Sequence, residues 1–223
     1  MSSNGDFNNS EQSLLYYVHR APSVKTAKPP LLILLHGTGS NEQDLFSFAD
    51  QLPGKFLVVS ARAPYTISPG SYTWYELHFV NGKPIYNKAQ AEQSRKTILA
   101  FIEQLKAKHD FDPAQVYLCG FSQGGIMSYS VGLTQPGKVK GIAVMSGRLL
   151  EEVKTMVAPA AQLKSLQVFI SHGTQDNVLT VQYARESQAY LKQLGITPQY
   201  KEYPEPHTIS REMFNDLLNW LNK

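Results

Sequence analysis

The apolar residues along the chain are grouped in a way that predicts a series of buried strands. Continuous apolar runs occur at 31–35, 56–59, 116–119, 142–145 and 168–170. Runs without alternation are typical of strands that are covered on both faces, as in parallel sheets. Two further strand candidates are 14–18 and 199–203, and the polar character of the second indicates a place nearer to a sheet edge.

Helical periodicity separates these strands. Two sets of apolar residues repeat every three or four positions, namely Ile98, Phe101, Ile102 and Leu105, and Met213, Phe214, Leu217, Leu218 and Leu221. This spacing places each set on one face of a helix, which we expect to pack on the core. The alternation of strands and helices predicts an α/β fold with a mostly parallel central sheet and helices on both faces.

The chain divides into a short tail and one domain. Residues 1–12 are polar and rich in Asn and Ser, which predicts a disordered N-terminal tail. Residues 13–223 contain no internal repeat and no long Gly/Ser linker, and their number is ample for a sizeable core. We therefore predict a single α/β domain over 13–223, without a separate cap domain.

Residues 64–88 interrupt the alternation. Asn81-Gly82 is a dipeptide that favours a tight hairpin turn, and aromatic residues crowd the first arm. Two interpretations stay open at this point. The segment is either a surface loop whose aromatic side chains cover the sheet edge, or a wall of an active site.

Composition excludes several classes of protein. Hydrophobic residues make up 42% and charged residues 17%, with a formal net charge of +3. Lys and Arg are scattered among acidic residues, so nucleic acid is not expected as a partner. No apolar run approaches membrane-spanning length, and the first residues lack the basic and apolar regions of a secretory signal. A single cysteine, Cys119, excludes an internal disulfide and is expected to be buried. These features predict a cytoplasmic protein.

The segment Gly120-Phe-Ser-Gln-Gly124 carries the first chemical signal. It follows an apolar strand candidate and precedes a stretch compatible with a helix, which is the context of a nucleophile elbow. A serine hydroxyl is a weak nucleophile and must be exposed and backed by a base. A sharp strand-to-helix turn would expose Ser122, and the glycines would leave room where the turn crowds the backbone. We predict Ser122 as the nucleophile.

The chain order of the remaining candidates predicts a triad. After Ser122 the histidines are His172 and His207, and Asp176 is the only aspartate between them. Asp176 and His207 each follow a different strand, so we expect both at the sheet edge where Ser122 lies. His207 would accept the serine proton and Asp176 would orient the imidazole and stabilise its cation. We expect His172, like His36, to tie loops together by hydrogen bonds.

Two more site elements follow from the same logic. An oxyanion hole needs two N–H donors, usually one after the nucleophile and one from the loop after the third strand. We predict the backbone N–H groups of Gln123 and Thr38. For the substrate pocket, we predict that Trp74 and Tyr75, in the aromatic arm, form one wall. A pocket with so little cover would be shallow and would favour small or short-acyl esters.

Four blocks of sequence resemble a known family. They are HGTGSNEQDL (36–45), GFSQGGIMS (120–128), SHGTQDNVL (171–179) and PHTIS (206–210), in this order. They resemble the small α/β-hydrolases of the phospholipase/carboxylesterase group, which includes acyl-protein thioesterases. The resemblance implies the α/β-hydrolase fold and the same roles for Ser122, Asp176, His207, Thr38 and Gln123. One position departs from the pattern, since Pro206 stands where the family commonly has Gly.

The leading hypothesis is a serine hydrolase that cleaves carboxylic esters, or thioesters, through an acyl-enzyme. Such chemistry needs no cofactor, and no cluster with zinc-ligand spacing predicts a metal site. The alternatives are a small-molecule receptor on the same scaffold, with an inactive or very slow triad, and an interaction protein without a site. The intact set of Ser122, Asp176 and His207 argues against the last. A homodimer is a further possibility that the sequence leaves open.

Overall fold

A seven-stranded sheet forms the centre of the protein. The computed structural model describes residues 13–80 and 83–223, so the predicted tail 1–12 and the turn Asn81-Gly82 lie outside the described residues. In spatial order the strands are β1 (Tyr17–Arg20), β3 (Leu57–Ala61), β2 (Leu31–Leu35), β8 (Val116–Phe121), β9 (Gly141–Met145), β10 (Gln167–Gly173) and β11 (Gln199–Tyr203). β1 pairs antiparallel with β3, and all other neighbours are parallel.

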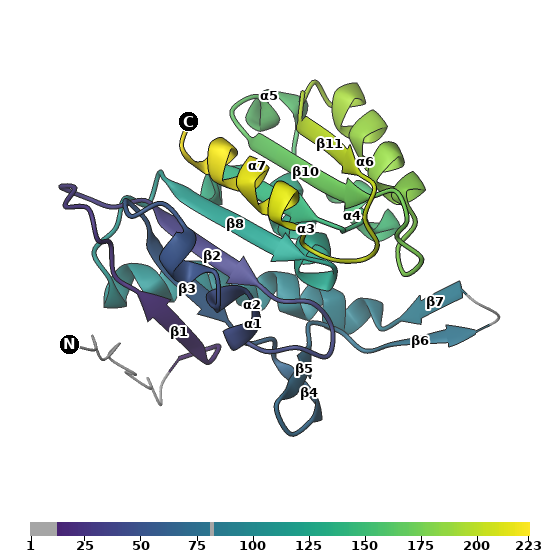
Figure 1. Ribbon diagram of the computed structural model, residues 1–223, viewed down its shortest axis with the longest axis horizontal. Helices are drawn as coiled ribbons and strands as arrows, with labels where there is room; N and C mark the ends of the chain where they lie inside the picture. The colour runs from purple at the N-terminus through teal and green to yellow at the C-terminus, as the bar shows by residue number, and fades with distance from the viewer. Residues whose placement is uncertain (1–12, 81–82) are drawn as a thin grey trace.

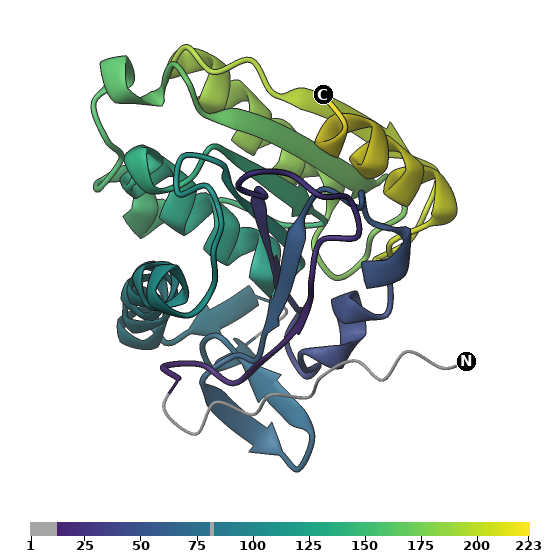
Figure 2. The same cartoon turned by 90° about the vertical axis from the view of Figure 1, so that its left-hand side faces the viewer.

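Helices cover both faces of this sheet (Figures 1 and 2). One layer contains α2 (Lys88–Lys108), α3 (Gln123–Thr134), α4 (Glu151–Lys154), α5 (Ala160–Leu163) and α6 (Val181–Gln193). The other contains α1 (Gln43–Phe46), the 3-10 turn Ala49–Gln51 and α7 (Arg211–Leu221). A second 3-10 turn, Pro136–Lys138, follows α3. The predicted three-layer α/β architecture is therefore confirmed.

The continuous apolar runs of the sequence arise from this layering. Side chains alternate between the two faces of a strand, so a strand between two helix layers needs apolar residues at every position. In β2, Leu31, Ile33 and Leu35 pack beneath the α2–α3 layer. Leu32 and Leu34 pack beneath α7 and α1. All five β2 side chains are buried, as are those of β3 and β9.

The prediction of the first strand needs correction at its ends. The first strand covers Tyr17–Arg20 and not 14–18, because its partner β3 ends at Ala61, which pairs with Tyr17. Leu14 lies beyond that end and is 54% exposed. The polar strand Gln199–Tyr203 is the edge strand β11, as predicted.

The segment that interrupts the alternation forms two hairpins outside the three layers. They are β4 (Tyr65–Ser68) with β5 (Ser71–Thr73), and β6 (Leu77–Val80) with β7 (Lys83–Tyr86). Figure 1 shows both hairpins projecting from the body of the protein. The N–H of Tyr72 donates to the carbonyl of Ser40, and the N–H of Gly39 donates to the carbonyl of Tyr72, both at 2.8 Å, which joins the first hairpin to the loop after β2. The segment therefore approaches the sheet edge where the candidate site lies.

Candidate active site

Ser122 lies at a sharp turn between β8 and α3. Its backbone has φ 53°, a left-handed conformation that is costly for a residue with a side chain. Gly120 and Gly124 make the turn possible, since a Cβ on Gly120 would overlap the backbone of Gly124 and one on Gly124 would overlap the carbonyl of Leu35. The N–H of Ser122 donates to the carbonyl of Met145 at 2.8 Å. The predicted elbow geometry is present.

The three predicted triad residues are in contact with one another. His207 Nε2 lies 3.0 Å from Ser122 Oγ, and His207 Nδ1 lies 2.6 Å from Asp176 Oδ2. Because a carboxylate only accepts, Nδ1 carries the hydrogen and Nε2 is free to accept the serine proton. The His207 ring packs on Phe121 with centroids 4.9 Å apart, which limits its rotation. The arrangement can deprotonate Ser122.

Asp176 is buried and receives hydrogen bonds on both carboxylate oxygens. Its Oδ1 accepts from the N–H groups of Val178 and Leu179, at 2.9 and 2.8 Å. Its Oδ2 faces His207 and, at 3.2 Å, also His172 Nε2. These donors hold the carboxylate in one orientation.

His172 is a structural histidine, as predicted, but it also touches the triad. Its Nε2 lies 2.6 Å from the carbonyl of Leu179 and thereby ties the Asp176 loop to β10. Both neighbours of Nε2 are acceptors, so this nitrogen carries the hydrogen. Burial lowers the pKa of His172, which keeps the ring neutral. The sequence did not predict its contact with Asp176.

His36 ties two loops at the same sheet edge. Its Nε2 accepts from the N–H of Ala63 at 3.0 Å, after β3, and its Nδ1 donates to the carbonyl of Gly37 at 2.7 Å. The predicted loop-tying role is confirmed. Burial lowers the pKa of His36, because a cation in this position would lose its hydration.

The buried histidines should make stability depend on pH. In the unfolded chain an imidazole gains a proton below about pH 6.5, whereas burial lowers the folded pKa of His36, His109 and His172. The unfolded state then binds more protons, so the free energy of unfolding should fall as pH falls from about 7.5 to about 5.5. Carboxylates with lowered pKa, such as Glu42 and Glu202, act below this window.

Urea denaturation at several pH values tests this prediction. His109→Gln removes the half-buried imidazole of this set and should flatten the dependence, whereas the same substitution at the exposed His78 should leave it unchanged. Equal free energies of unfolding at pH 5.5 and 7.5 would contradict the prediction.

The two predicted oxyanion donors face the same space as Ser122. Gln123 is the first residue of α3, and Thr38 lies in the loop after β2. Among the residues that the structure describes, no acceptor receives a hydrogen bond from either backbone N–H. The first N–H groups of a helix have no partner within the helix, so Gln123 is well placed to stabilise a developing negative charge.

The side chain of Gln123 has a role that sequence reasoning missed. Its amide is buried, with Oε1 accepting from the N–H of Trp74 at 2.7 Å and Nε2 donating to the carbonyl of Tyr75 at 2.8 Å. Thr73 Oγ1 lies 2.9 Å from the same Oε1. The residue next to the nucleophile therefore holds the aromatic arm in place. The one signal in the sequence is that Gln123 is a polar residue at the beginning of a helix whose other residues are mostly apolar.

A cavity of about 310 Å³ opens in front of Ser122. It is lined by Gly37, Thr38, Tyr75, Leu77, Phe121, Ser122, Gln123, Ile126, Arg148, Val178, Leu179 and His207. The cavity thus joins the candidate nucleophile, base and oxyanion donors with a mostly apolar wall. Its volume lies at the small end of the range for ligand sites, about 300–1,000 Å³. Within the described residues, no group of three or more His, Cys, Asp or Glu could hold a metal ion.

The structure corrects the pocket prediction for Trp74. Tyr75 lines the cavity as predicted, but Trp74 does not, and its side chain is fully buried. The Trp74 indole N–H donates to the carbonyl of His36 at 3.0 Å. The two residues lie in a bend after β5, and their rings have different neighbours: Trp74 packs near His36, with ring centroids 5.8 Å apart, and Tyr75 near Tyr86, at 5.4 Å. Trp74 braces the oxyanion loop from behind.

We therefore expect Trp74→Phe to lower stability and to leave ester selectivity unchanged. The substitution leaves a buried carbonyl without its donor and opens a small cavity, at a cost of about 2–4 kcal/mol in the free energy of unfolding. Denaturation curves measure the first effect, and relative kcat/KM across an ester series measures the second. Tyr75→Ala is the matched comparison and should change the relative rates. A change in selectivity only in Trp74→Phe would contradict this assignment.

The loop that carries His207 accommodates Pro206 without losing a hydrogen bond. The carbonyl of Glu205 accepts from the N–H of Gln175, at 3.0 Å, and the carbonyl of Tyr203 accepts from the N–H of Thr174, at 2.7 Å. Both bonds join this loop to the loop of Asp176. Pro206 itself is exposed. The departure from the family pattern leaves the contact between His207 and Ser122 intact.

Comparisons with known proteins identify the family and relatives of similar length. The family model described as Phospholipase/Carboxylesterase matches residues 20–223. Carboxylesterase SOBER1 of Arabidopsis thaliana is 28% identical over 205 residues, covering 86% of this chain and 89% of that protein. Acyl-protein thioesterase 1 of Kluyveromyces lactis is 30% identical over 222 residues, covering 92% and 96%. The crystal structure of esterase PE8 superposes with a TM-score of 0.79 at 26% identity, covering 93% of this chain and 98% of that one.

The fold and the elbow, taken with these matches, define an α/β-hydrolase. The chain belongs to the phospholipase/carboxylesterase family. Across residues 13–80 and 83–223, none of the helices combines the length and apolar character that crossing a bilayer requires.

Proposed function

We propose that this protein is a serine hydrolase that cleaves carboxylic esters through an acyl-enzyme. The observation that carries the proposal is the continuous chain of contacts from Asp176 through His207 to Ser122, at 2.6 and 3.0 Å. The family supports it, since similar proteins are named carboxylesterase and acyl-protein thioesterase. The chemistry belongs to the carboxylic ester hydrolases, and thioesters are a second substrate class.

Acylation begins at Ser122. His207 Nε2 takes the hydroxyl proton while Ser122 Oγ attacks the ester carbonyl. Asp176 holds His207 in the tautomer that leaves Nε2 free and stabilises the imidazolium that forms. The backbone N–H groups of Thr38 and Gln123 stabilise the negative charge on the former carbonyl oxygen. His207 then gives its proton to the leaving alcohol, and the acyl group stays on Ser122.

Deacylation repeats these steps with water. A water molecule gives a proton to His207 and attacks the acyl carbonyl, and the same two N–H groups stabilise the second tetrahedral intermediate. The carboxylic acid leaves and Ser122 regains its proton. Apart from the ester and water, every step uses groups of this chain.

The size of the cavity supports small substrates. Its apolar wall, formed in part by Tyr75, Leu77 and Ile126, suits the acyl or alkyl part of an ester. The hairpins reach the site without forming a domain over it, so little of the wall comes from outside the core. Small or short-acyl esters are therefore proposed ahead of long-chain lipids.

A panel of p-nitrophenyl esters of increasing chain length tests the function. Wild-type protein should release a burst of nitrophenol followed by a slower steady rate, which is the kinetic signature of an acyl-enzyme. Rates should be highest for short chains, with Ser122→Ala as the blank. The receptor alternative predicts binding of these esters without a burst and with no difference in turnover between wild type and Ser122→Ala.

Two features outside the site stay predictions. A cytoplasmic location is supported by the single cysteine, Cys119, which is buried in β8 and whose thiol pKa burial raises to about 12. A homodimer is open to a direct test by light scattering of the purified protein. Neither feature is needed for the proposed chemistry.

A further inference from the structure

Arg148 is the one permanently charged cation among the residues that line the cavity. His207 would become a cation only for the time that it holds the serine proton. It follows β9 in the segment Ser146-Gly147-Arg148, at the same sheet edge as Ser122. Its side chain also borders a smaller surface depression formed with α4 and α6, which includes Glu151, Lys154 and Glu186. Arg148 therefore marks the boundary between the catalytic cavity and the protein surface.

Two tyrosine rings hold the guanidinium of Arg148. Its carbon atom Cζ lies 5.3 Å from the ring centroid of Tyr86 and 5.4 Å from that of Tyr183. Ring faces attract a cation without neutralising it. The N–H groups at the edge of the guanidinium remain able to donate, because a ring contact uses its face. The half-buried side chain is thus held in place without a hydrogen-bond acceptor from the residues that the structure describes.

No carboxylate neutralises Arg148 within the part of the chain that the structure describes. Among these residues, no hydrogen bond and no ion pair within 4.0 Å involves its side chain. The acidic neighbours have other partners. Glu152 accepts from the Tyr86 hydroxyl at 2.7 Å, Glu151 pairs with Lys154 at 2.7 Å, and Glu186 is contacted by Gln182 at 3.1 Å.

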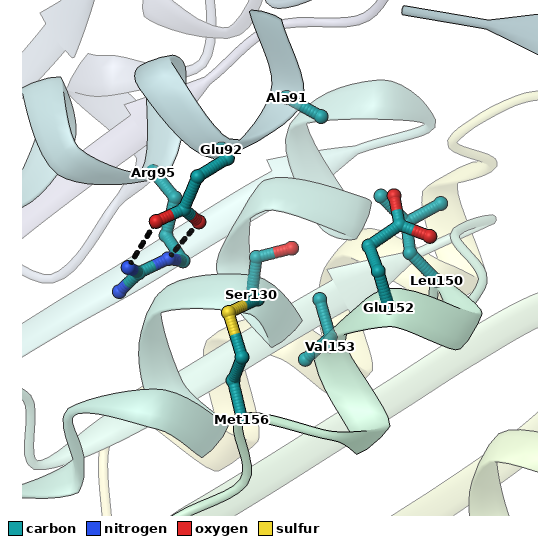
Figure 3. A pocket seen from close by; sticks show the side chains of 8 residues that line it. All are labelled: Ala91, Glu92, Arg95, Ser130, Leu150, Glu152, Val153 and Met156. Carbon is teal, nitrogen blue, oxygen red and sulfur yellow. Dashed lines mark hydrogen bonds and ion pairs between the residues drawn. The ribbon is translucent and has the colours of Figure 1, made fainter. Parts of the chain in front are cut away.

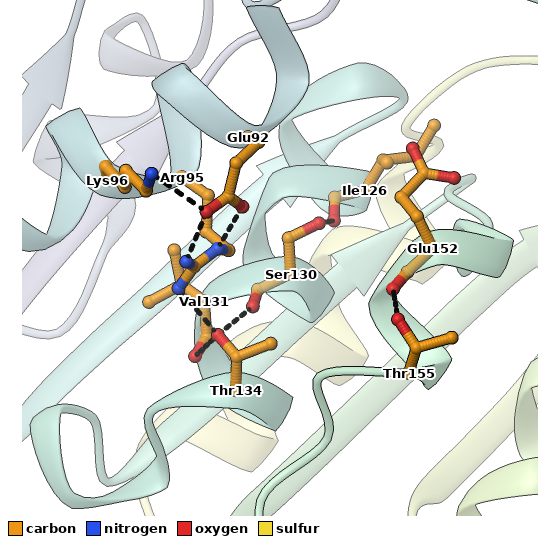
Figure 4. A network of polar contacts seen from close by, with 9 residues as sticks. All are labelled: Glu92, Arg95, Lys96, Ile126, Ser130, Val131, Thr134, Glu152 and Thr155. Atoms are coloured by element: carbon orange, nitrogen blue, oxygen red, sulfur yellow. Dashed lines mark hydrogen bonds and ion pairs between the residues drawn. The ribbon is translucent and has the colours of Figure 1, made fainter. Parts of the chain in front are cut away.

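Arg95 is a useful comparison with Arg148, because it also borders a cavity but lies away from Ser122. It borders a second cavity, between α2, α3 and α4, that is lined by apolar and polar residues in equal number and has a volume of about 20 Å³ (Figure 3). There the Arg95 guanidinium makes two hydrogen bonds to Glu92, both 2.7 Å, and a third to Thr134 Oγ1 at 3.0 Å (Figure 4). That cavity has room for about one water molecule. The arginine at the small cavity is paired with a carboxylate, whereas Arg148 at the catalytic cavity has no carboxylate partner among the described residues.

We propose that Arg148 binds an anionic group of the substrate, so that this enzyme prefers esters that carry a free carboxylate. This inference rests on the proposed esterase function and names its substrate class. A guanidinium offers a planar fork of donors that matches a carboxylate, and it is less strongly hydrated than an ammonium group. The rest of the cavity wall is mostly apolar, so a substrate carboxylate would remain there only if Arg148 paired with it.

Matched pairs of esters test the charge preference. 4-Nitrophenyl hexanoate and mono-4-nitrophenyl adipate differ at the far end of the acyl chain, where a methyl group is replaced by a carboxylate. 4-Methylphenyl acetate and 4-acetoxybenzoate make the same comparison in the alcohol part. Wild type should prefer the charged ester of at least one pair in kcat/KM. Arg148→Gln should lower kcat/KM for that ester by about 10- to 100-fold, as expected for a hydrogen bond between charged groups.

Three further results decide the proposal. Arg148→Gln should change kcat/KM for the neutral esters by less than about threefold, and Arg148→Lys should restore part of the preference because it keeps the charge but not the fork. Arg211→Gln removes the same charge from an exposed position outside the cavity and should leave the preference intact. An equal loss for charged and neutral esters in Arg148→Gln, or a wild type that prefers the neutral member of both pairs, would overturn the proposal.

A binding measurement separates this proposal from the proposed function. Ser122→Ala and the double variant Ser122→Ala, Arg148→Gln can be titrated calorimetrically with the four esters. Stronger binding of a charged ester only where Arg148 is present supports the anion site even if the wild type turns over no ester. Equal affinities of the two variants for the charged esters contradict it, whether or not the esterase activity is found.

Discussion

Ser122→Ala is expected to fold normally and to lose about three to six orders of magnitude in kcat toward esters. The elbow presents one hydroxyl to His207, and alanine removes that hydroxyl without adding volume. The left-handed backbone at this position, φ 53°, is no harder for alanine than for serine, so the turn should persist. Circular dichroism and the thermal midpoint check the fold, and initial rates with a p-nitrophenyl ester check the chemistry.

A covalent probe makes this prediction residue-specific. A fluorophosphonate should label wild-type protein once, at Ser122, and should fail to label Ser122→Ala. Ser146 is the control, because among the described residues it is the other serine with a left-handed backbone, φ 51°, and it is buried. Ser146→Ala should still be labelled. Labelling that persists in Ser122→Ala would contradict the assignment of the nucleophile.

Asp176→Asn is expected to lower kcat by about 10⁴-fold while substrate binding stays close to that of wild type. The carboxylate accepts at Oδ2 from His207 Nδ1 at 2.6 Å. An amide nitrogen at that position would require His207 to present an acceptor there, which places the hydrogen on Nε2 and blocks proton transfer from Ser122. The amide also lacks the charge that stabilises the imidazolium.

His172→Gln separates catalytic from structural effects around Asp176. A glutamine amide can donate toward the Leu179 carbonyl as His172 Nε2 does, and it should lower stability more than it lowers kcat. Burst amplitude and kcat with one ester, measured beside the free energy of unfolding, compare the two variants. The assignment of Asp176 as the triad acid would be contradicted by a kcat for Asp176→Asn near that of wild type. It would also be contradicted if His172→Gln were folded and as inactive as Asp176→Asn.

Sequence patterns were sufficient for the elements whose signal is local. A strand between two helix layers must be apolar at every position, so the run 31–35 was assigned with its observed limits. The strand–turn–helix context of Ser122 is equally local, because the glycines are needed at fixed positions in the turn. The chain order of Asp176 and His207 sufficed to predict their contacts, since strands of a parallel sheet deliver their following loops to one edge.

Helix α6 and the N-terminal limit of the first strand show where the local sequence pattern predicts burial poorly. The buried positions of α6, Ala184, Ser187 and Leu191, are mostly small or polar, so they form no apolar stripe. Leu14 is apolar but lies beyond the end of its partner strand. In both cases the neighbour in space, and not the residue type, determines burial.

What the sequence by itself determined is the layered α/β fold, the elbow of Ser122 and the order of the residues that meet there, because each follows from periodicity or from turn chemistry. The tertiary structure decided which side chains face the cavity. Trp74 and Tyr75 are adjacent aromatic residues, yet one braces the His36 carbonyl and the other lines the cavity. Arg148 carries no motif, and its unpaired guanidinium becomes apparent only when the positions of Tyr86 and Tyr183, and of the surrounding carboxylates, are known in space.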